Sequence, residues 1–384
     1  MVKHYDLAVV GAGIVGLGVA LAAAQKGLSV IVIDRDKRAN GASIRNFGFV
    51  TVTGQKAGAH WQRARKSRDI WADIAPKANI PVLQHGLVLP AYRTEAVDVL
   101  HEFLQTEMGA DCHLIDTKTA QEKIPLLRQS GIQEILFSPH ELRVESASAI
   151  PQLQKWLTEA LNVDFLWNAT VKEVTDQGIN SSAGLIRAES IAVCPGNEFS
   201  TLFPDLIATH DLKISTLQML RLTAPNMPHL QSPVMSDLSL ARYEGFTNLA
   251  SSGALQNRLD QELPETREAG IHLIAVQSAD GSLIVGDSHV YSDTPEPFAS
   301  GKTEELILEA FKDVIDLPDY RVSERWTGSY AAASDRPILV ERPAQNIRLV
   351  IVTGGTGAST GLALGEQIVT DLFDPNTETT EALS

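Results

Sequence analysis

The chain has 384 residues, of which 44% are hydrophobic and 21% are charged, and its formal net charge is −15. This length is sufficient for a substantial core and favours two domains over one. The acidic balance argues against a nucleic-acid-binding protein and against one that is held on anionic membranes. The two cysteines, Cys112 and Cys194, are too few for a disulfide framework or for a zinc site of paired cysteines.

No targeting or membrane segment is expected. The chain begins MVKHYDLAVV, and Gly11 and Gly13 interrupt the apolar stretch too early for a signal peptide. No segment approaches the roughly 20 apolar residues of a membrane span. We therefore expect a cytoplasmic protein, either a monomer or a homo-oligomer.

The first elements in chain order form a dinucleotide-binding pattern. Residues 6–10 are predicted as a buried strand, GAGIVG follows at 11–16, a helix is expected over 17–26, and a second strand over 29–33 ends at an acidic residue. The first glycine allows the tight turn, the second lets the backbone approach a pyrophosphate, and the third lets the helix pack on the sheet. The acidic residue can bind ribose hydroxyls and disfavours NADP. The cofactor-binding residues predicted here are Gly11, Gly13, Ile14, Val15, Gly16, Asp34 and Arg35.

The rest of the chain reads as a mixture of helices and strands. Helices are expected over 59–78, 94–108 with Thr94 as N-cap, 148–162 and 302–315. Strands are expected over 82–83, 86–90, 135–137, 142–144, 212–222, 271–277 and 283–286. The last ten or so residues are expected to be a frayed tail.

Three further features indicate which dinucleotide binds. NGAS at 40–43 and RNFG at 45–48 follow the second strand, and ESIAVCPG at 189–196 is a strand that ends in a glycine turn. LVIVT at 349–353 leads into GGTG at 354–357 and a helix over 360–372. Together these resemble the D-amino-acid oxidase (DAO) superfamily, in particular its glycine oxidase and sarcosine oxidase branch, over the whole chain with a weakly matched middle.

This resemblance implies an α/β fold. A Rossmann-like FAD-binding domain of the glutathione-reductase type would take 1–80, 140–210 and 325–384. It would be interleaved with an α+β substrate domain, built on a mixed or antiparallel sheet, at 81–139 and 211–324. The serine-containing loop would hold the pyrophosphate, and the C-terminal glycine loop would reach the flavin, whose negative charge on reduction a helix N-terminus stabilises. The further cofactor-binding residues are Ser43, Arg45, Asn46, Val171, Gly196, Gly354, Gly355, Thr356, Gly357, Ser359 and Thr360.

The implied reaction is oxidation of a small primary or secondary amine by hydride transfer to flavin N5, followed by imine hydrolysis. The segment at 326–337, where sarcosine oxidases carry a flavin-linking cysteine, has none, so non-covalent FAD is expected. Ser329, Tyr330 and Ala331 occupy the neighbourhood of the carboxylate-binding arginine of glycine oxidases. Arg45, Arg325 and Arg336 remain as candidate anion clamps, and Tyr330 as a residue facing flavin or substrate.

The stretch GASIRNFG at 41–48 with TGQ at 53–55 resembles a bacterial subgroup associated with phosphonate breakdown. Its implied substrate is 2-aminoethylphosphonate or the N-methyl form, giving phosphonoacetaldehyde, with oxygen or a quinone as electron acceptor. The alternatives are a glycine- or sarcosine-type amino-acid oxidase, an enzyme of 2-hydroxy acids or glycerol phosphate, and a flavin-binding assembly subunit without turnover of its own. Histidines 60, 85, 140, 210, 229, 272 and 289 show no metal-ligand spacing, so no metal is expected.

Overall fold

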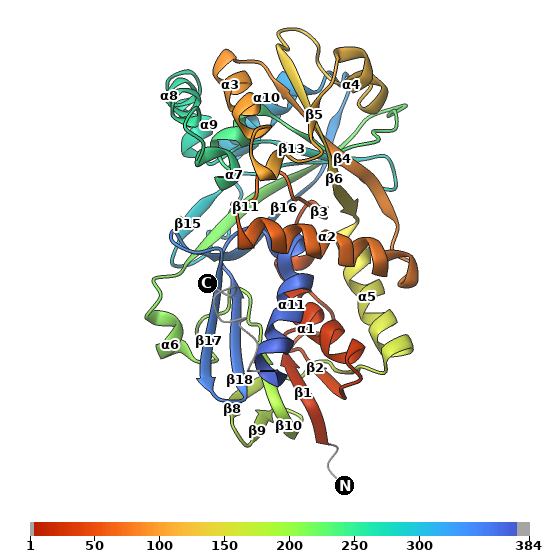
Figure 1. Cartoon of the computed structure of the whole chain (residues 1–384), viewed down its shortest axis with the longest axis vertical. Coiled ribbons are helices and arrows are strands. Elements are labelled where there is room, and N and C mark those ends of the chain that lie inside the picture. The colour runs from red at the N-terminus through yellow and green to blue at the C-terminus, as the bar shows by residue number, and fades with distance from the viewer. Residues whose placement is uncertain (1–3, 375–384) are drawn as a thin grey trace.

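The computed structural model describes residues 4–374, so the expected tail at the C-terminus lies outside the described residues. The described residues form two β-sheets, one in the lower and one in the upper half of Figure 1. Helix α2 (Ala59–Lys77) crosses the molecule between them. No helix among residues 4–374 combines the length and hydrophobicity needed to cross a bilayer.

The first sheet is built around parallel strands. Strands β18, β10, β1, β2 and β7 run parallel in that order, and β17 joins the β18 edge antiparallel. Residues 7–10 of β1 and all of β2 are apolar and buried because both faces of a parallel sheet are covered. In sheet order, with the added hairpin last, the strands are β17 (Ile338–Ala344), β18 (Ile347–Val352), β10 (Gly184–Val193), β1 (His4–Val10), β2 (Val30–Ile33), β7 (Asp164–Leu166), β8 (Val171–Thr175) and β9 (Gly178–Ser181).

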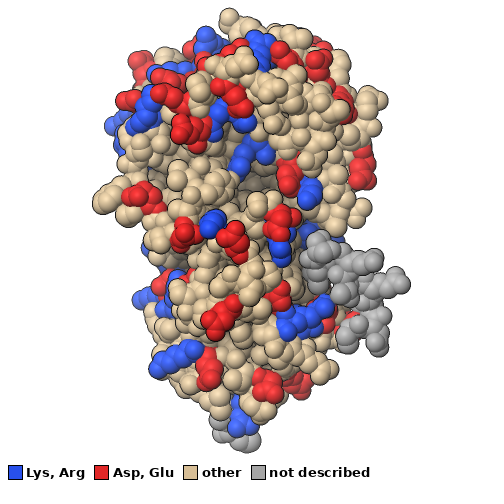
Figure 2. Space-filling view, turned by 90° about the vertical axis from the view of Figure 1, so that its left-hand side faces the viewer, with Lys and Arg blue, Asp and Glu red and all other residues tan. Residues whose placement is uncertain are grey.

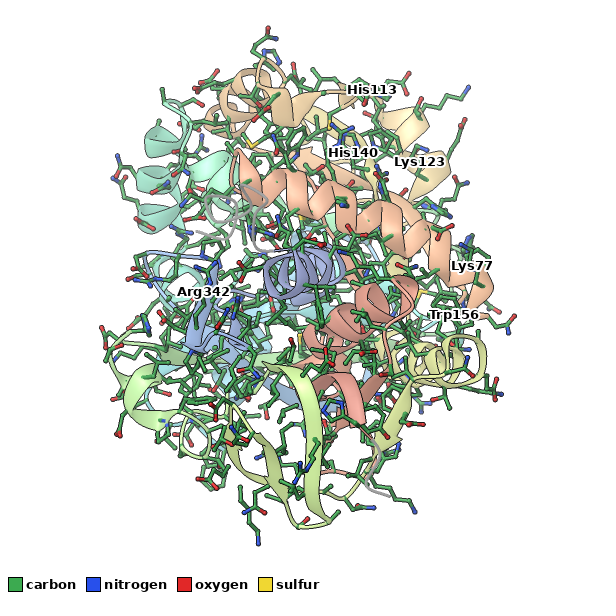
Figure 3. The ribbon with its side chains drawn as sticks, turned by 60° about the horizontal axis from the view of Figure 1, so that its bottom comes forward. Lys77, His113, Lys123, His140, Trp156 and Arg342 are labelled. Carbon is green, nitrogen blue, oxygen red and sulfur yellow. The ribbon has the colours of Figure 1, made fainter. Side chains whose placement is uncertain are left out.

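Helices α1 (Ile14–Gln25), α5 (Ser146–Leu161) and α11 (Gly357–Phe373) cover one face of this sheet, and the β8–β9 hairpin and α6 (Pro204–Ala208) pack on the other. Helix α1 is apolar almost all round because it is enclosed by the sheet, α5 and α11. Figure 3 looks along α11, which lies between the side of β17, marked by Arg342, and the side of α5, marked by Trp156. Arg342 Nη2 lies 2.7 Å from Asp371 Oδ1 and fastens β17 to α11.

The second sheet has ten strands and is mostly antiparallel. Its longest pairings join β11 with β16 and β4 with β6. Its apolar face packs against α3 (Thr94–Phe103), α8 (Ser252–Glu262) and α10 (Gly301–Val314). In sheet order, with the two side strands last, the strands are β15 (Val290–Ser292), β11 (Lys213–Thr223), β14 (Leu283–Gly286), β13 (Ile274–Gln277), β12 (Val234–Met235), β4 (Val82–Ala91), β6 (Glu134–Val144), β3 (Phe49–Val50), β16 (Arg321–Ala332) and β5 (His113–Leu114).

Several elements differ from the sequence-based expectation. Helix α3 is shorter than expected, and its N-cap is Arg93 rather than Thr94, without a side-chain cap. The two strands expected at 82–90 form one strand β4, with Gly86 at a bulge, and those at 135–144 form one strand β6. The further short elements are η1 (Ala42–Ile44), η2 (Glu107–Gly109), α4 (Thr117–Lys123), η3 (Asp237–Ala241), α7 (Glu244–Thr247) and α9 (Pro264–Glu268).

The expected domain boundaries at 140 and 325 fall inside β6 and β16, which both belong to the second sheet. A boundary placed inside a hydrogen-bonded strand would divide one sheet between two domains. The division of the chain into two domains stays a prediction, with its limits better placed at the ends of these strands.

Candidate functional site

A cavity of about 540 Å³ is lined from both sheets. The carboxyl ends of β1, β2 and β10 open into it from the first sheet, and β11 and β16 contribute from the second. The carboxyl edge of a parallel sheet is where α/β folds bind their ligands. Figure 2 shows a face on which acidic and basic side chains are interspersed and which is hollowed in its upper half.

The glycine turn after β1 is fixed by backbone contacts. Gly11 has a φ of +104°, and a Cβ on it would lie 2.4 Å from the carbonyl oxygen of Cys194. A Cβ on Gly16 would lie 2.0 Å from the carbonyl oxygen of Gly11, so both positions require glycine. A Cβ on Gly13 would lie 3.1 Å from Ser43 Oγ, which is a tight contact, and the bare backbone of Gly13 lines the cavity.

Asp34 stands at the carboxyl end of β2 and lines the cavity. Its Oδ2 accepts a hydrogen bond from the backbone of Ala12 (2.8 Å), and its Oδ1 accepts one from the backbone of Asp36 (2.9 Å). The carboxylate therefore braces the glycine turn. Each oxygen retains a second lone pair, with which it can accept a ribose hydroxyl.

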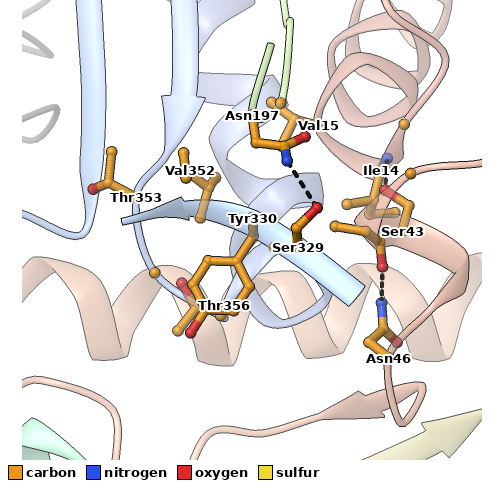
Figure 4. Close-up of a pocket in the computed structure, with 18 of the residues that line it drawn as sticks. Ile14, Val15, Ser43, Asn46, Asn197, Ser329, Tyr330, Val352, Thr353 and Thr356 are labelled. Carbon is orange, nitrogen blue, oxygen red and sulfur yellow. Dashed lines mark hydrogen bonds between the residues drawn. The ribbon is translucent and has the colours of Figure 1, made fainter. Parts of the chain in front are cut away.

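The loop after β2 reaches over the start of α1 (Figure 4). Ser43 Oγ accepts a hydrogen bond from the backbone N–H of Ile14 (2.9 Å), one of the free donors at the helix N-terminus. Asn46 Nδ2 donates to the carbonyl of Ala42 (2.8 Å), which closes the loop on itself. The Arg45 guanidinium donates to Asn40 Oδ1 (3.2 Å) and weakly to a backbone carbonyl of β16 (3.4 Å).

The C-terminal glycine loop forms another wall. Tyr330 on β16 lies beside Thr356 in Figure 4, and a Cβ on Gly355 would lie 3.4 Å from the Tyr330 hydroxyl. Burial raises the pKa of Tyr330 far above its usual value, so the phenol stays neutral and can donate a hydrogen bond. Thr356 Oγ1 is buried and has no hydrogen-bond partner within residues 4–374. A buried orphan hydroxyl on a cavity wall indicates a missing polar ligand.

The structure brings most of the predicted residues to this cavity. Those that line it are Gly11, Gly13, Ile14, Val15, Gly16, Asp34, Arg35, Ser43, Arg45, Asn46, Val171, Gly196, Tyr330, Arg336, Gly354, Gly355, Thr356 and Gly357.

Three predicted residues do not line the cavity. Arg325 lies on the surface and pairs with Glu304, with Nε and Nη2 at 2.6 and 2.7 Å from the carboxylate oxygens. Ser359 Oγ accepts a hydrogen bond from the backbone N–H of Thr51 (2.9 Å). Thr360 Oγ1 donates to the carbonyl one helical turn earlier, at 2.9 Å. Arg336 lines the cavity but is paired with its neighbour Asp335, with 3.0 Å from Nε to either carboxylate oxygen.

Sequence reasoning missed a cluster of polar residues on the side of the cavity that the second sheet forms. Arg242, which follows η3, donates to the Tyr291 hydroxyl (2.6 Å) and lies 5.9 Å from that ring centroid. Desolvation works against the Arg242 charge, but nearby tyrosines and Asp287 outweigh it and raise its pKa. No local motif marks Arg242 or Tyr291, because the two residues come from loops that are far apart in the sequence. The other missed members are Tyr243, His272, Asp287 and His289.

Burial disfavours the thiolate form of both cysteines. Cys194, at the end of β10, lines the cavity, and burial raises its pKa to about 12. Burial also raises the pKa of Cys112, to about 11. Since the thiolate is the nucleophile, both thiols are poorly suited to a covalent flavin bond at neutral pH.

These features fit FAD. The free N–H groups at the start of α1, flanked by Ser43, suit a pyrophosphate, and Asp34 suits a ribose. A Cβ on Gly196 or Gly354 would meet nothing within 4 Å, so open space adjoins the bare backbone there. Thr356, whose hydroxyl lacks a partner, lines the cavity on the C-terminal glycine loop and could hold a polar group of the cofactor.

Comparison with known proteins agrees with this fit. The family model "DAO: FAD dependent oxidoreductase" matches residues 6–372. No curated protein matches the chain.

Several solved structures share the fold. L-proline dehydrogenase from P. horikoshii is 18% identical with a TM-score of 0.78, over 99% of this chain and 96% of that one. Glycine oxidase from Geobacillus kaustophilus is 16% identical with a TM-score of 0.77, over 99% and 98%. The FAD-bound L-α-glycerophosphate oxidase from Mycoplasma pneumoniae is 15% identical with a TM-score of 0.72, over 97% and 95%.

The predicted fold class is therefore confirmed, and so is the FAD cofactor. Identities this low establish a common fold, whereas the family match covers almost every described residue. The chain belongs to the DAO family of FAD-dependent oxidoreductases.

Proposed function

We propose that this protein oxidises a small amine that carries an oxyanion group, and that the substrate is 2-aminoethylphosphonate or its N-methyl derivative. The observation that carries this proposal is the state of Arg242. Within residues 4–374 no carboxylate lies within ion-pair distance of its guanidinium, which donates a hydrogen bond to the Tyr291 hydroxyl. A half-buried cation with spare donors on a cavity wall is suited to bind an anion.

The other cavity arginines are less available. Arg336 is paired with Asp335, and Arg45 is held by Asn40 and by a backbone carbonyl. The proposed anion clamp therefore moves from the residues expected from the sequence to Arg242, with Lys56 lining the same cavity. Arg325 is no longer a candidate, because it lies outside the cavity and pairs with Glu304.

The related structures support both parts of the substrate. Two of them are named for oxidation of the amino acids proline and glycine, and one for oxidation of glycerophosphate, which carries a tetrahedral phosphate. Bound FAD would supply the acceptor for a hydride from the carbon next to the amine nitrogen, and water would hydrolyse the imine to the aldehyde and ammonia, or methylamine from the N-methyl substrate. The protein holds the anion at Arg242 and so orients the substrate in the cavity. We further propose that the flavin is bound non-covalently, since both thiols are kept protonated.

The test is anaerobic mixing of the holoprotein with 2-aminoethylphosphonate, N-methyl-2-aminoethylphosphonate, glycine, sarcosine and glycerol phosphate, while the visible flavin band is followed. Fast bleaching by the aminophosphonates supports the proposal. Bleaching by glycine or sarcosine alone would retain amine oxidation but refute the phosphonate assignment, and bleaching by glycerol phosphate alone would indicate alcohol oxidation. If dithionite reduces the flavin but none of these compounds does, the result would favour an assembly subunit without turnover of its own.

A pair of variants tests the clamp. Arg242→Met should raise the substrate concentration for half-maximal bleaching by about 30- to 1000-fold, which corresponds to the loss of about 2–4 kcal/mol for a desolvated charge-assisted contact. Arg325→Met removes the same charge outside the cavity and should leave this concentration unchanged. Equal effects of the two substitutions would refute the role of Arg242.

A further inference from the structure

Three buried side chains on the cavity wall share one small space. His272 precedes β13, Asp287 follows β14 and His289 precedes β15. Their side chains are 4%, 8% and 5% exposed, and each offers one ligand atom within 4.8 Å of the other two. All three residues line the cavity.

The outer nitrogen of each imidazole is held by an acceptor. His289 Nδ1 lies 3.0 Å from the carbonyl oxygen of Gly270, which can only accept, so Nδ1 carries the hydrogen. Ser239 donates its hydroxyl hydrogen to the carbonyl of His272 (2.9 Å), so at 3.3 Å from His272 Nδ1 the same oxygen accepts. In their neutral form both imidazoles therefore present the lone pair of Nε2 to the carboxylate. Metal-binding histidines are typically oriented in this way by a second hydrogen bond.

The carboxylate at the centre of this cluster is incompletely hydrogen-bonded. Asp287 Oδ1 lies 3.1 Å from His272 Nε2, and Oδ2 lies 3.8 Å from His289 Nε2. Asp287 Oδ1 is nevertheless buried without a hydrogen-bond partner among the described residues. Lone pairs that converge on a buried carboxylate repel it unless a cation lies between them.

We infer that His272, Asp287 and His289 bind a divalent first-row transition-metal cation on the wall of the substrate cavity. Two imidazole nitrogens and one carboxylate oxygen suit Zn²⁺, Co²⁺ or Fe²⁺ better than Mg²⁺ or Ca²⁺, which prefer oxygen ligands throughout. Three protein ligands leave coordination positions open, and the cavity supplies water or a small oxyanion to fill them. Since Arg242 is a neighbouring charge, an anion placed between it and the metal lowers their mutual repulsion.

The backbone is shaped for this arrangement. Gly270 has a φ of +65°, and a Cβ there would lie 2.8 Å from His289 Cβ. The backbone N–H of His289 donates to the carbonyl of Ala269 (2.9 Å), next to the contact that holds its Nδ1. Two adjacent carbonyls therefore fix both the backbone and the ring of His289.

The test is zinc binding to tag-free holoprotein that has been stripped with a chelator. Zn²⁺ binding is measured by isothermal titration, and metal per FAD by mass spectrometry after dialysis. The wild type should bind one equivalent. His289→Gln should weaken binding by more than about 100-fold, and Ser239→Ala, which removes only the hydrogen-bond partner of a ligand, by about tenfold. His60→Gln changes another buried histidine of the same cavity and should leave zinc affinity unchanged.

This experiment does not depend on the amine substrate, because its readout is metal content. A wild type that takes up no stoichiometric zinc would overturn the inference, and so would equal zinc affinity in wild type and His289→Gln. FAD content serves as the check on folding for each variant. If His289→Gln fails to retain FAD, the stoichiometry of the wild type and the effect of Ser239→Ala decide the question.

Discussion

Helices α1 and α11 cross so closely that their glycines touch backbone to backbone. A Cβ on Gly365 would lie 2.1 Å from the carbonyl carbon of Gly18, and one on Gly18 would lie 2.3 Å from the carbonyl oxygen of Gly361. We expect Gly365→Ala to destabilise the protein. An ordinary contact needs about 3.4 Å or more, so the helix axes would have to separate by about 1 Å.

The net cost follows from two opposing effects. Overpacking of this kind costs about 1–3 kcal/mol, and alanine returns up to about 1 kcal/mol of helix propensity. The obstacle is backbone on a helix already enclosed by the sheet and α5, so it cannot rotate away as a side chain does. We expect the upper part of the overpacking range and therefore a net loss of about 2 kcal/mol. Helix α11 begins at the C-terminal glycine loop, so FAD affinity should fall as well.

Thermal and urea unfolding followed by flavin fluorescence measure this loss. Gly253→Ala is the matched control, because Gly253 also lies in a helix and a Cβ there would meet nothing within 4 Å. The control should be neutral or slightly stabilising. A Gly365→Ala protein as stable as the wild type, with unchanged FAD affinity, would refute the claim that this crossing is limited by backbone contact.

Three further outcomes are expected. Ser43→Ala should weaken FAD binding by about fivefold, which corresponds to about 1 kcal/mol, because one hydrogen bond that orders the start of α1 is lost; flavin fluorescence titration measures it. Burial lowers the pKa of His60 from 6.5 to about 4. Between pH 4 and pH 6.5, His60 is therefore protonated in the unfolded chain but not in the folded one. Stability should be complete above about pH 6.5 and fall by up to about 3 kcal/mol as the pH decreases to 4, and His60→Gln should remove that part of the slope in urea unfolding. Arg93→Met should cost about 3–5 kcal/mol by leaving the buried Asp237 carboxylate unpaired, whereas Lys77→Met, which breaks an exposed pair, should cost less than about 0.5 kcal/mol; equal costs would contradict the importance of burial.

The dinucleotide half was predictable because its signals are local. The first strand, the glycine turn, the first helix and the second strand follow one another within 34 residues. The steric reason for Gly16 operates within that unit, because a Cβ there would meet the carbonyl oxygen of Gly11. The C-terminal loop and helix were predictable for the same reason. The boundaries were less accurate. Thr94 has the side chain of a good N-cap, but the helix begins one residue earlier than a Thr94 cap requires.

The substrate side was not predictable from sequence because its contacts are not local. Strand β16 is fixed by pairing with β11, with Tyr330 opposite Ser215, and its own sequence contains a glycine and few fully buried residues. Arg242 meets Tyr291 across 49 residues, and no repeat or spacing indicates that contact. The histidines were judged by spacing alone. His272 and Asp287 lie on different strand ends, so only the sheet brings them together.

The order of strands in the first sheet has a consequence for biosynthesis. Strand β10 lies between β1 and β18, and β18 enters the chain more than 150 residues after β10, at Ile347–Val352. Throughout that interval one edge of β10 has no partner, and an unpaired edge is a template for association with other chains. The first sheet therefore cannot be completed while the residues between β10 and β18 are still being translated. Sheets completed by such distant segments fold slowly, and chaperone demand during translation should be set by this one late strand.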